Sequence, residues 1–183
     1  MNIFYLSKDV EECVRFHNDK HCIKMILEYA QLMSTAHRLL DGTQIDAKTK
    51  TGRKTSRFVL PDDREVHLYK ASHANHPSAV WTRQSSTNYY WLFNLWSNLM
   101  KEYTYRYGKS HASERLHNYL YLCPSNIAEG PFTEPTPAMP DEVKVAGDSI
   151  ASYRNYYINN KKHLASWRGK INSRPVPDWF KTV

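Results

Sequence analysis

Glycine is scarce in this sequence, and no glycine-rich phosphate loop is present. Only six of the 183 residues are glycine, and neither GxGxxG, nor GxSxG, nor GxxxxGK followed by Ser or Thr occurs. These patterns form the dinucleotide-binding turn, the nucleophile elbow and the P-loop, where the backbone must approach a phosphate or turn sharply. Their absence argues against kinases, Rossmann oxidoreductases and α/β-hydrolases.

Cysteine and long apolar runs are also scarce. Cys13, Cys22 and Cys123 are odd in number and follow no CxxC spacing, which argues against a disulfide framework and a cysteine zinc site. No apolar run approaches the roughly 18 residues that a membrane span requires, and the first residues do not form a signal-peptide pattern. We therefore expect a protein of a reducing cytoplasm that does not enter a membrane.

The sequence is rich in positive charge and in aromatic rings. Lys and Arg number 25 against 18 Asp and Glu, which gives a net charge of +7, and aromatic residues make up 13% of the chain. A basic surface with many rings suits polyanions whose bases can stack on it. We therefore predict nucleic acid or a nucleotide as the partner; the sequence does not identify a cofactor.

The periodicity of apolar residues predicts a single, mainly α-helical domain over residues 1–183. Asp9 with Glu12 has the pattern of a capping box and predicts one long helix to about Leu40. A helix start at Pro77 and a stop at Gly108 bound one helix or two, with Ser85 or Ser86 as an internal cap. A shorter helix is predicted at residues 113–122, and Asp148 predicts the start of a last long helix at residues 149–167.

Three segments between the helices have other patterns. NIFYL (residues 2–6) and RFVL (residues 57–60) are β-prone and predict a short N-terminal β pair. Residues 43–57 are polar, basic and aperiodic, which predicts a mobile loop whose lysines and arginines can reach a partner. Residues 124–147 contain many prolines, which exclude regular helix and indicate an ordered belt over the domain.

The opening helix has one polar stripe. At 100° per residue, His17, His21, Lys24 and Glu28 fall on one side, together with Gln31 and Thr35. The opposite face is apolar and predicts the core side: Phe16, Ile23, Ile26, Ala30, Met33, His37 and Leu40. We interpret His17, His21 and Lys24 as a cationic surface that holds phosphate.

Two residues of the opening helix offer other chemistry. The HxxxH spacing of His17 and His21 would let both bind one metal ion, but Asn18 replaces the glutamate of HExxH and no third ligand is fixed. Asp19 falls among apolar positions, so its carboxylate needs a partner or a raised pKa. Asp19 is therefore either in a structural ion pair or, with Glu28, a candidate catalytic acid or base.

A second constellation is SHANHPSAVWTRQS (residues 72–85). His76 and Arg83 lie at a predicted helix entrance, where free backbone amides attract anions, so we predict that both hold phosphate. Trp81 and Tyr89 are the predicted base-stacking rings, although a tryptophan at helical spacing also fits a core position.

Several stretches together resemble a group of small proteins encoded by tailed bacteriophages, notably marine ones. They are MNIFYL, HNDKHCIKMILEYAQLMSTAHR, HPSAVWTRQS, NYYWL, EYTYRYGK, GPFTEPTPAMPDEVKV, SYRNYY and the terminal WF. The resemblance covers nearly the whole chain. It implies a context, the cytoplasm of an infected host bacterium, and assigns no catalytic residue.

These observations lead to one hypothesis with two alternatives. Small phage proteins of this type often act on nucleotides or DNA, so we predict a nucleic-acid- or nucleotide-binding protein whose chemistry, if it has any, is base excision or base modification. The first alternative is a metal-dependent hydrolase built on His17 and His21. The second is a non-enzymatic inhibitor of a host protein, with the aromatic surface as its interface.

Overall fold

The computed structural model describes residues 1–49 and 51–181, and it confirms a mainly α-helical fold with a short β pair. The helices are α1 (Val10–Phe16), α2 (Asp19–Asp41), α3 (Arg64–His67), α4 (Pro77–Thr82), α5 (Ser86–Tyr107), α6 (His117–Leu120), α7 (Ser149–Asn160) and α8 (Asp178–Lys181). The strands are β1 (Thr43–Lys48) and β2 (Lys54–Val59), and the 3₁₀ turns are η1 (Ala112–Leu116), η2 (Asp141–Val143) and η3 (Lys162–Leu164).

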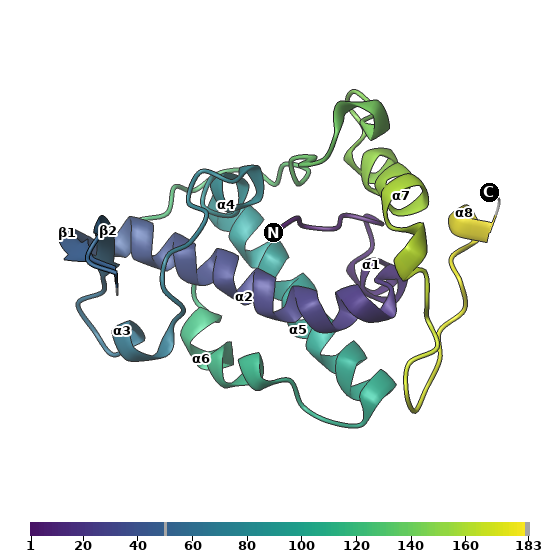
Figure 1. Cartoon of the computed structure of the whole chain (residues 1–183), viewed down its shortest axis with the longest axis horizontal. Helices are drawn as coiled ribbons and strands as arrows, with labels where there is room; N and C mark the ends of the chain where they lie inside the picture. Colours follow the sequence, from purple (N-terminus) through teal and green to yellow (C-terminus); the bar gives the residue numbers. More distant parts are fainter. Residues whose placement is uncertain (50, 182–183) are drawn as a thin grey trace.

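The two long helices α2 and α5 pack against each other at the centre of the molecule (Figure 1). Leu92, Leu95 and Leu99 of α5 are fully buried. Trp96 is buried too, and its indole N–H donates to the carbonyl of Ile26 at 2.9 Å. This bond satisfies a polar group inside the apolar contact and fixes the register of the two helices.

The opening helix is two helices, so the prediction of one long helix to Leu40 is wrong. Asp9 caps α1 as expected, because its carboxylate accepts from the Glu12 N–H at 2.7 Å. The chain then becomes extended at His17, and Asn18 caps α2 by accepting from the His21 N–H at 2.9 Å. Asparagine is a strong N-cap, and here it starts a second helix in a new direction.

NIFYL does not form a strand, so the expected pairing of this segment with RFVL is wrong. Ile3, Phe4, Tyr5 and Leu6 are instead extended and buried. The Phe4 N–H donates to the Tyr29 hydroxyl at 3.1 Å, so a side chain of α2 takes the place of a strand partner. The β pair lies later in the chain, where β2 includes the RFV residues and pairs with β1.

The later helix boundaries largely follow the predicted caps. Ser85 separates α4 from α5 and caps α5 through the Asn88 N–H. Gly108 ends α5 with φ 68°, a left-handed conformation that favours glycine. Asp148 caps α7, but this helix ends at Asn160, before the predicted residue 167.

The proline-rich belt is ordered, and within it only η2 is helical. Phe132 of the belt packs against Trp81 and Trp91. The side-chain amide of Asn88 donates to the Thr133 hydroxyl and accepts from the Thr133 N–H. Contacts with α4 and α5 therefore hold a segment that has little regular secondary structure of its own.

The basic segment predicted as a mobile loop forms the antiparallel hairpin β1–β2, with register Thr43↔Val59 to Lys48↔Lys54. Lys50 lies outside the described residues. We call residues 43–59 the arm; it projects from one end of the molecule, and the C-terminal residues lie at the other end (Figure 1). Within the described residues, no helix is long and apolar enough to cross a membrane.

Candidate nucleic-acid interface

A buried arginine fixes the base of the arm. Arg38 of α2 is 1% exposed, and all five of its guanidinium N–H groups have acceptors. The acceptors are the carbonyls of Phe58, Glu65, Leu68 and Tyr69 and the Glu65 carboxylate, at 2.5 to 3.0 Å. A fully satisfied guanidinium can be buried without an orphaned charge, so it joins α2, β2 and α3 rigidly.

Glu65 shares its carboxylate between the core and the arm. One oxygen accepts from Arg38 at 2.5 Å and from the Leu60 N–H at 3.0 Å, while the other accepts from Arg57 of β2 at 2.6 Å. Burial alone would raise the pKa of Glu65, but these hydrogen bonds outweigh it and lower the pKa to about 2. Glu65 is therefore ionised at neutral pH and orients β2.

Three further cations of the arm face solvent. Lys48, Arg53 and Lys54 are exposed, and none of them forms an ion pair within the part of the chain that the structure describes. The sequence of the arm has five cationic residues and one acid, Asp46. The arm thus carries a net charge of +4 out of the +7 of the whole chain.

His17 and His21 are buried, contrary to the expected wet stripe. His17 Nδ1 lies 2.8 Å from the Cys13 carbonyl and must carry the proton, so Nε2 accepts from the Tyr29 hydroxyl at 2.9 Å. His21 Nδ1 lies 2.6 Å from the Tyr157 hydroxyl, and its ring stacks on Phe4 at 4.1 Å. Burial lowers the pKa of His17 to about 4 and the pKa of His21 further. Both rings are neutral at pH 7 and add no charge for a phosphate.

The apolar face of the opening helix also differs from the prediction. Ile26, Ala30 and Met33 are buried as expected, whereas Ile23 is 41% exposed. Tyr157, which comes from α7 far along the chain, covers His21 and turns that part of the stripe toward the interior. The contact with α7 therefore overrides the local pattern.

Lys24 and Glu28 do lie at the surface of α2. Their side chains form an ion pair at 2.9 Å, and Glu28 also lies 3.3 Å from the amino group of Met1. His76 caps α4 by accepting from the Ser78 N–H at 3.2 Å. Burial, then the charges of the Met1 amino group and His73, lower the pKa of His76. The structure thus brings Lys24, Glu28 and His76, three of the predicted site residues, to one region.

Arg83, a predicted phosphate contact, and Trp81 and Tyr89, the predicted stacking rings, are engaged internally. Arg83 donates to the Ala74 carbonyl at 2.7 Å. Trp81 is 1% exposed and donates to the Thr133 carbonyl, and Tyr89 is fully buried and donates to the Leu120 carbonyl. Both rings are packed in the core and present no free face on which a base could stack.

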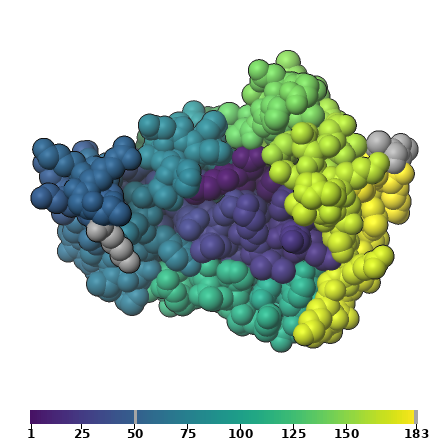
Figure 2. Space-filling view, in the orientation of Figure 1, coloured from purple at the N-terminus to yellow at the C-terminus, as the bar shows by residue number. Residues whose placement is uncertain are grey.

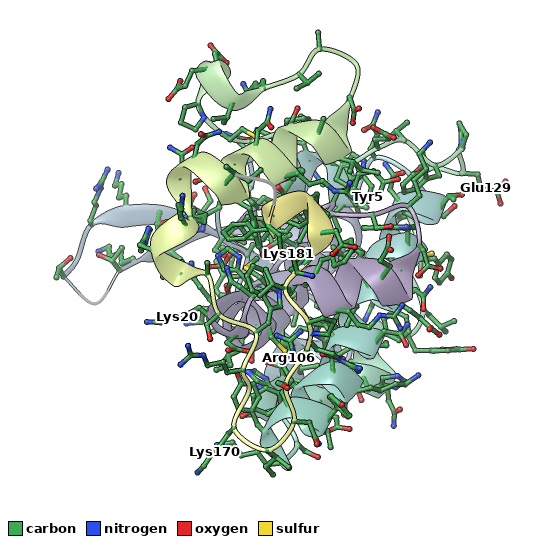
Figure 3. The ribbon with its side chains drawn as sticks, turned by 90° about the vertical axis from the view of Figure 1, so that its right-hand side faces the viewer. Tyr5, Lys20, Arg106, Glu129, Lys170 and Lys181 are labelled. Carbon is green, nitrogen blue, oxygen red and sulfur yellow. The ribbon has the colours of Figure 1, made fainter. Side chains whose placement is uncertain are left out.

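Asp19 is held in an ion pair with Arg106, at 3.1 Å, beneath residues 165–181, which we call the strap. Its carboxylate also accepts from the Ser166 hydroxyl at 2.6 Å and from the Arg168 N–H at 2.9 Å. Figure 3 shows Arg106 in the interior behind the strap, whereas Lys20 and Lys170 point outward. Asp19 therefore fastens the strap to the start of α2.

Within residues 1–49 and 51–181, no group of three or more His, Cys, Asp or Glu side chains could hold a metal ion. The sequence indicated that the lysines and arginines of this segment, with its charge run KTKTGRK, can reach a partner, but none of them was among the predicted site residues. In comparisons with protein families, curated proteins and solved structures, nothing matched the chain.

Proposed function

We propose that this protein binds nucleic acid and that the arm supplies its main contacts to the phosphate backbone. The observation that carries the proposal is the set of exposed, unpaired cations Lys48, Arg53 and Lys54 on a hairpin with a fixed base. A two-stranded β ribbon fits the major groove of a duplex, and Lys and Arg gain affinity by releasing counterions from phosphates. The arm provides both the two-stranded ribbon and the exposed cations.

A second group of cations extends the surface beyond the arm. Figure 2 shows the N-terminal residues and α2 (purple) exposed between the teal residues beside the arm and the yellow-green α7. Lys24 of α2 and Lys161, which follows α7, both act on His21 electrostatically, so the two cations flank this region. Lys161 also lies 4.8 Å from the centre of the Tyr156 ring. A strand leaving the arm would meet these cations on the same face.

Salt-dependent binding tests the proposal. Fluorescence anisotropy with labelled single- and double-stranded oligonucleotides, repeated over a range of salt concentrations, gives the slope of log K against log salt. Because each lost phosphate contact removes about 0.9 from the slope for a duplex, Arg53→Gln with Lys54→Gln should reduce its magnitude by about 1 to 2 and weaken binding. Lys170→Gln is the matched control, since Lys170 is also exposed but lies on the strap.

The outcomes are separable. A double variant that binds with the slope and affinity of the parent protein would remove the arm from the interface. Absence of salt-dependent binding by the parent protein would contradict the proposal as a whole and redirect the work to a host protein partner.

The proposal is limited to binding, because the two carboxylates predicted as acid or base are engaged. Asp19 is bound to Arg106 and the strap, and Glu28 is bound to Lys24 and the Met1 amino group. Base excision or modification stays a prediction from the sequence, as does the phage context, which would make DNA in an infected bacterium the polyanion.

A further inference from the structure

A cavity of about 480 Å³ lies between the arm and residues 70–74. Three cationic side chains line it, Lys48 and Arg57 from the arm and Lys70 from the facing segment, which also contributes the imidazole of His73. Four hydroxyl residues, three alanines and the half-buried Phe58 complete the lining, and no Asp or Glu is among its described residues. Positive charge, hydroxyl groups and one aromatic ring therefore meet in a single recess.

The backbone at His73 is strained at this cavity. Its φ is 50°, and it is the one non-glycine residue with positive φ among residues 1–49 and 51–181. Such a conformation costs free energy and is found where the surrounding structure enforces it, often at binding sites. The enforcement is visible here, because Thr35 of α2 binds the backbone of Ser72 and Arg83 binds the carbonyl of Ala74. The strained turn holds the imidazole at the wall of the cavity.

The size and lining of the cavity restrict its ligand. Its volume falls within the range of about 300–1,000 Å³ that small-molecule sites occupy. Lys48, Lys70 and His73 suit a phosphate, the hydroxyl groups suit a sugar, and the Phe58 ring offers an apolar surface for a base. An inorganic phosphate would use the cations alone and leave the ring without a partner.

We propose that this cavity binds one nucleoside monophosphate, either free or as the terminal 5′-phosphorylated residue of a strand. The inference deepens the proposed function and rests on it, because the arm that contacts the strand also forms one wall of the cavity. The phosphate lies among Lys48, Lys70 and His73, and the base lies against Phe58.

Calorimetric titration of the full-length protein with deoxyadenosine monophosphate, deoxyadenosine and inorganic phosphate tests the ligand class. The monophosphate should bind at least tenfold more tightly than either of the others. Lys70→Gln and His73→Asn should each weaken its binding severalfold; asparagine tolerates the left-handed backbone, so the second variant removes the imidazole and keeps the turn. Lys170→Gln should bind as the parent does.

The same variants separate this inference from the proposed function. Arg53→Gln with Lys54→Gln should weaken oligonucleotide binding and leave monophosphate binding unchanged, since neither residue lines this cavity. Tighter binding of a 5′-phosphorylated oligonucleotide than of its 5′-hydroxyl form would support a strand end as the ligand, and equal affinities would support the free nucleotide.

Oligonucleotide binding without monophosphate binding would overturn the cavity proposal and leave the proposed function standing. Monophosphate binding that survives both Lys70→Gln and His73→Asn would overturn it as well. Monophosphate binding with no oligonucleotide binding would retain the cavity and contradict the interface on the arm.

Discussion

The arm and the strap lie at opposite ends of the molecule, and a buried arginine fastens each of them (Figure 1). Arg38 holds the base of the arm, and Arg106, which is fully buried, holds the strap by donating to Asp19 and Glu102 and to the carbonyls of Arg15 and His17. The two ends differ in whether the cations named here are paired with carboxylates. The strap's Arg174 is paired with Glu102, whereas Lys48 and Lys54 of the arm are unpaired.

A buried arginine therefore has a different role at each end. At the strap, the carboxylates of Asp19 and Glu102 are both paired with arginines, and these ion pairs serve the structure. At the arm, Glu65 alone serves both Arg38 and Arg57, so positive charge is left over and is presented on a rigid support. A buried clamp is thus a structural element at one end and a means of positioning an interface at the other.

The largest expected effect is at the strap. Arg106→Met removes the ion-pair partner that Asp19 and Glu102 share, and breaking a buried ion pair costs about 3–5 kcal/mol. Arg38→Met should cost less, because it breaks one ion pair in place of two, and Glu65 keeps Arg57. Urea denaturation measures both free energies of unfolding. Arg38→Met should also weaken oligonucleotide binding, and equal binding by the two variants would remove the distinction between the ends.

An intermediate effect should follow from pH, at both ends. Burial lowers the pKa of His17, near the strap, and of His37, near the arm, from 6.5 to about 4. At pH values between about 4 and 6.5, the unfolded chain binds more protons than the folded protein. The free energy of unfolding therefore falls as the pH falls, by up to about 1.4 kcal/mol per pH unit for each histidine. Urea denaturation at pH 7.5 and pH 5 measures the loss, and His17→Gln or His37→Gln should make the dependence shallower.

A direct readout of the rings accompanies that experiment. Imidazole signals followed by NMR should show His17 and His37 neutral at pH 5. Protonation of both buried rings near pH 6.5, with unchanged stability at pH 5, would contradict the buried state of these residues.

The smallest effects compare single surface-reaching cations at the two ends. Arg174 binds both oxygens of Glu102 at 2.9 Å and stacks on the Tyr105 ring at 3.9 Å, so Arg174→Gln should cost about 1–2 kcal/mol. Lys54→Gln should change the free energy of unfolding by less than about 0.5 kcal/mol, because the exposed side chain has no ion pair to lose. Thermal or urea unfolding measures both. A larger cost at Lys54 would mean that the arm's charge is structural.

Local signals predicted the helix ends well. Asp9, Ser85, Gly108 and Asp148 act within a few residues of their own position, so their roles could be read from the sequence. Asn18 has the same capping chemistry, but apolar periodicity on both sides of it suggested a continuous helix. The sequence therefore indicated the fold class, and it missed the break between α1 and α2.

Contacts between distant residues decided the parts that the sequence did not predict. His21 is buried by Tyr157, 136 positions away, and NIFYL satisfies its backbone with Tyr29 in place of a strand. The clamp of the arm likewise depends on residues up to 31 positions from Arg38. No periodicity within one segment encodes such pairings. We therefore propose the interface on the arm, whereas the sequence had indicated the opening helix. The charge of the arm could be read from the sequence, but its hairpin structure could not.

The arm has a further consequence for the behaviour of the protein in solution. Within the described residues the sheet contains the two strands β1 and β2, so each strand has one edge whose backbone groups lack a neighbouring strand there. Such edges invite pairing with another chain, and lysine at an edge opposes it by repulsion. The positively charged side chains proposed to contact phosphate therefore also keep the arms of separate molecules apart, and any polyanion that neutralises them removes that protection against aggregation.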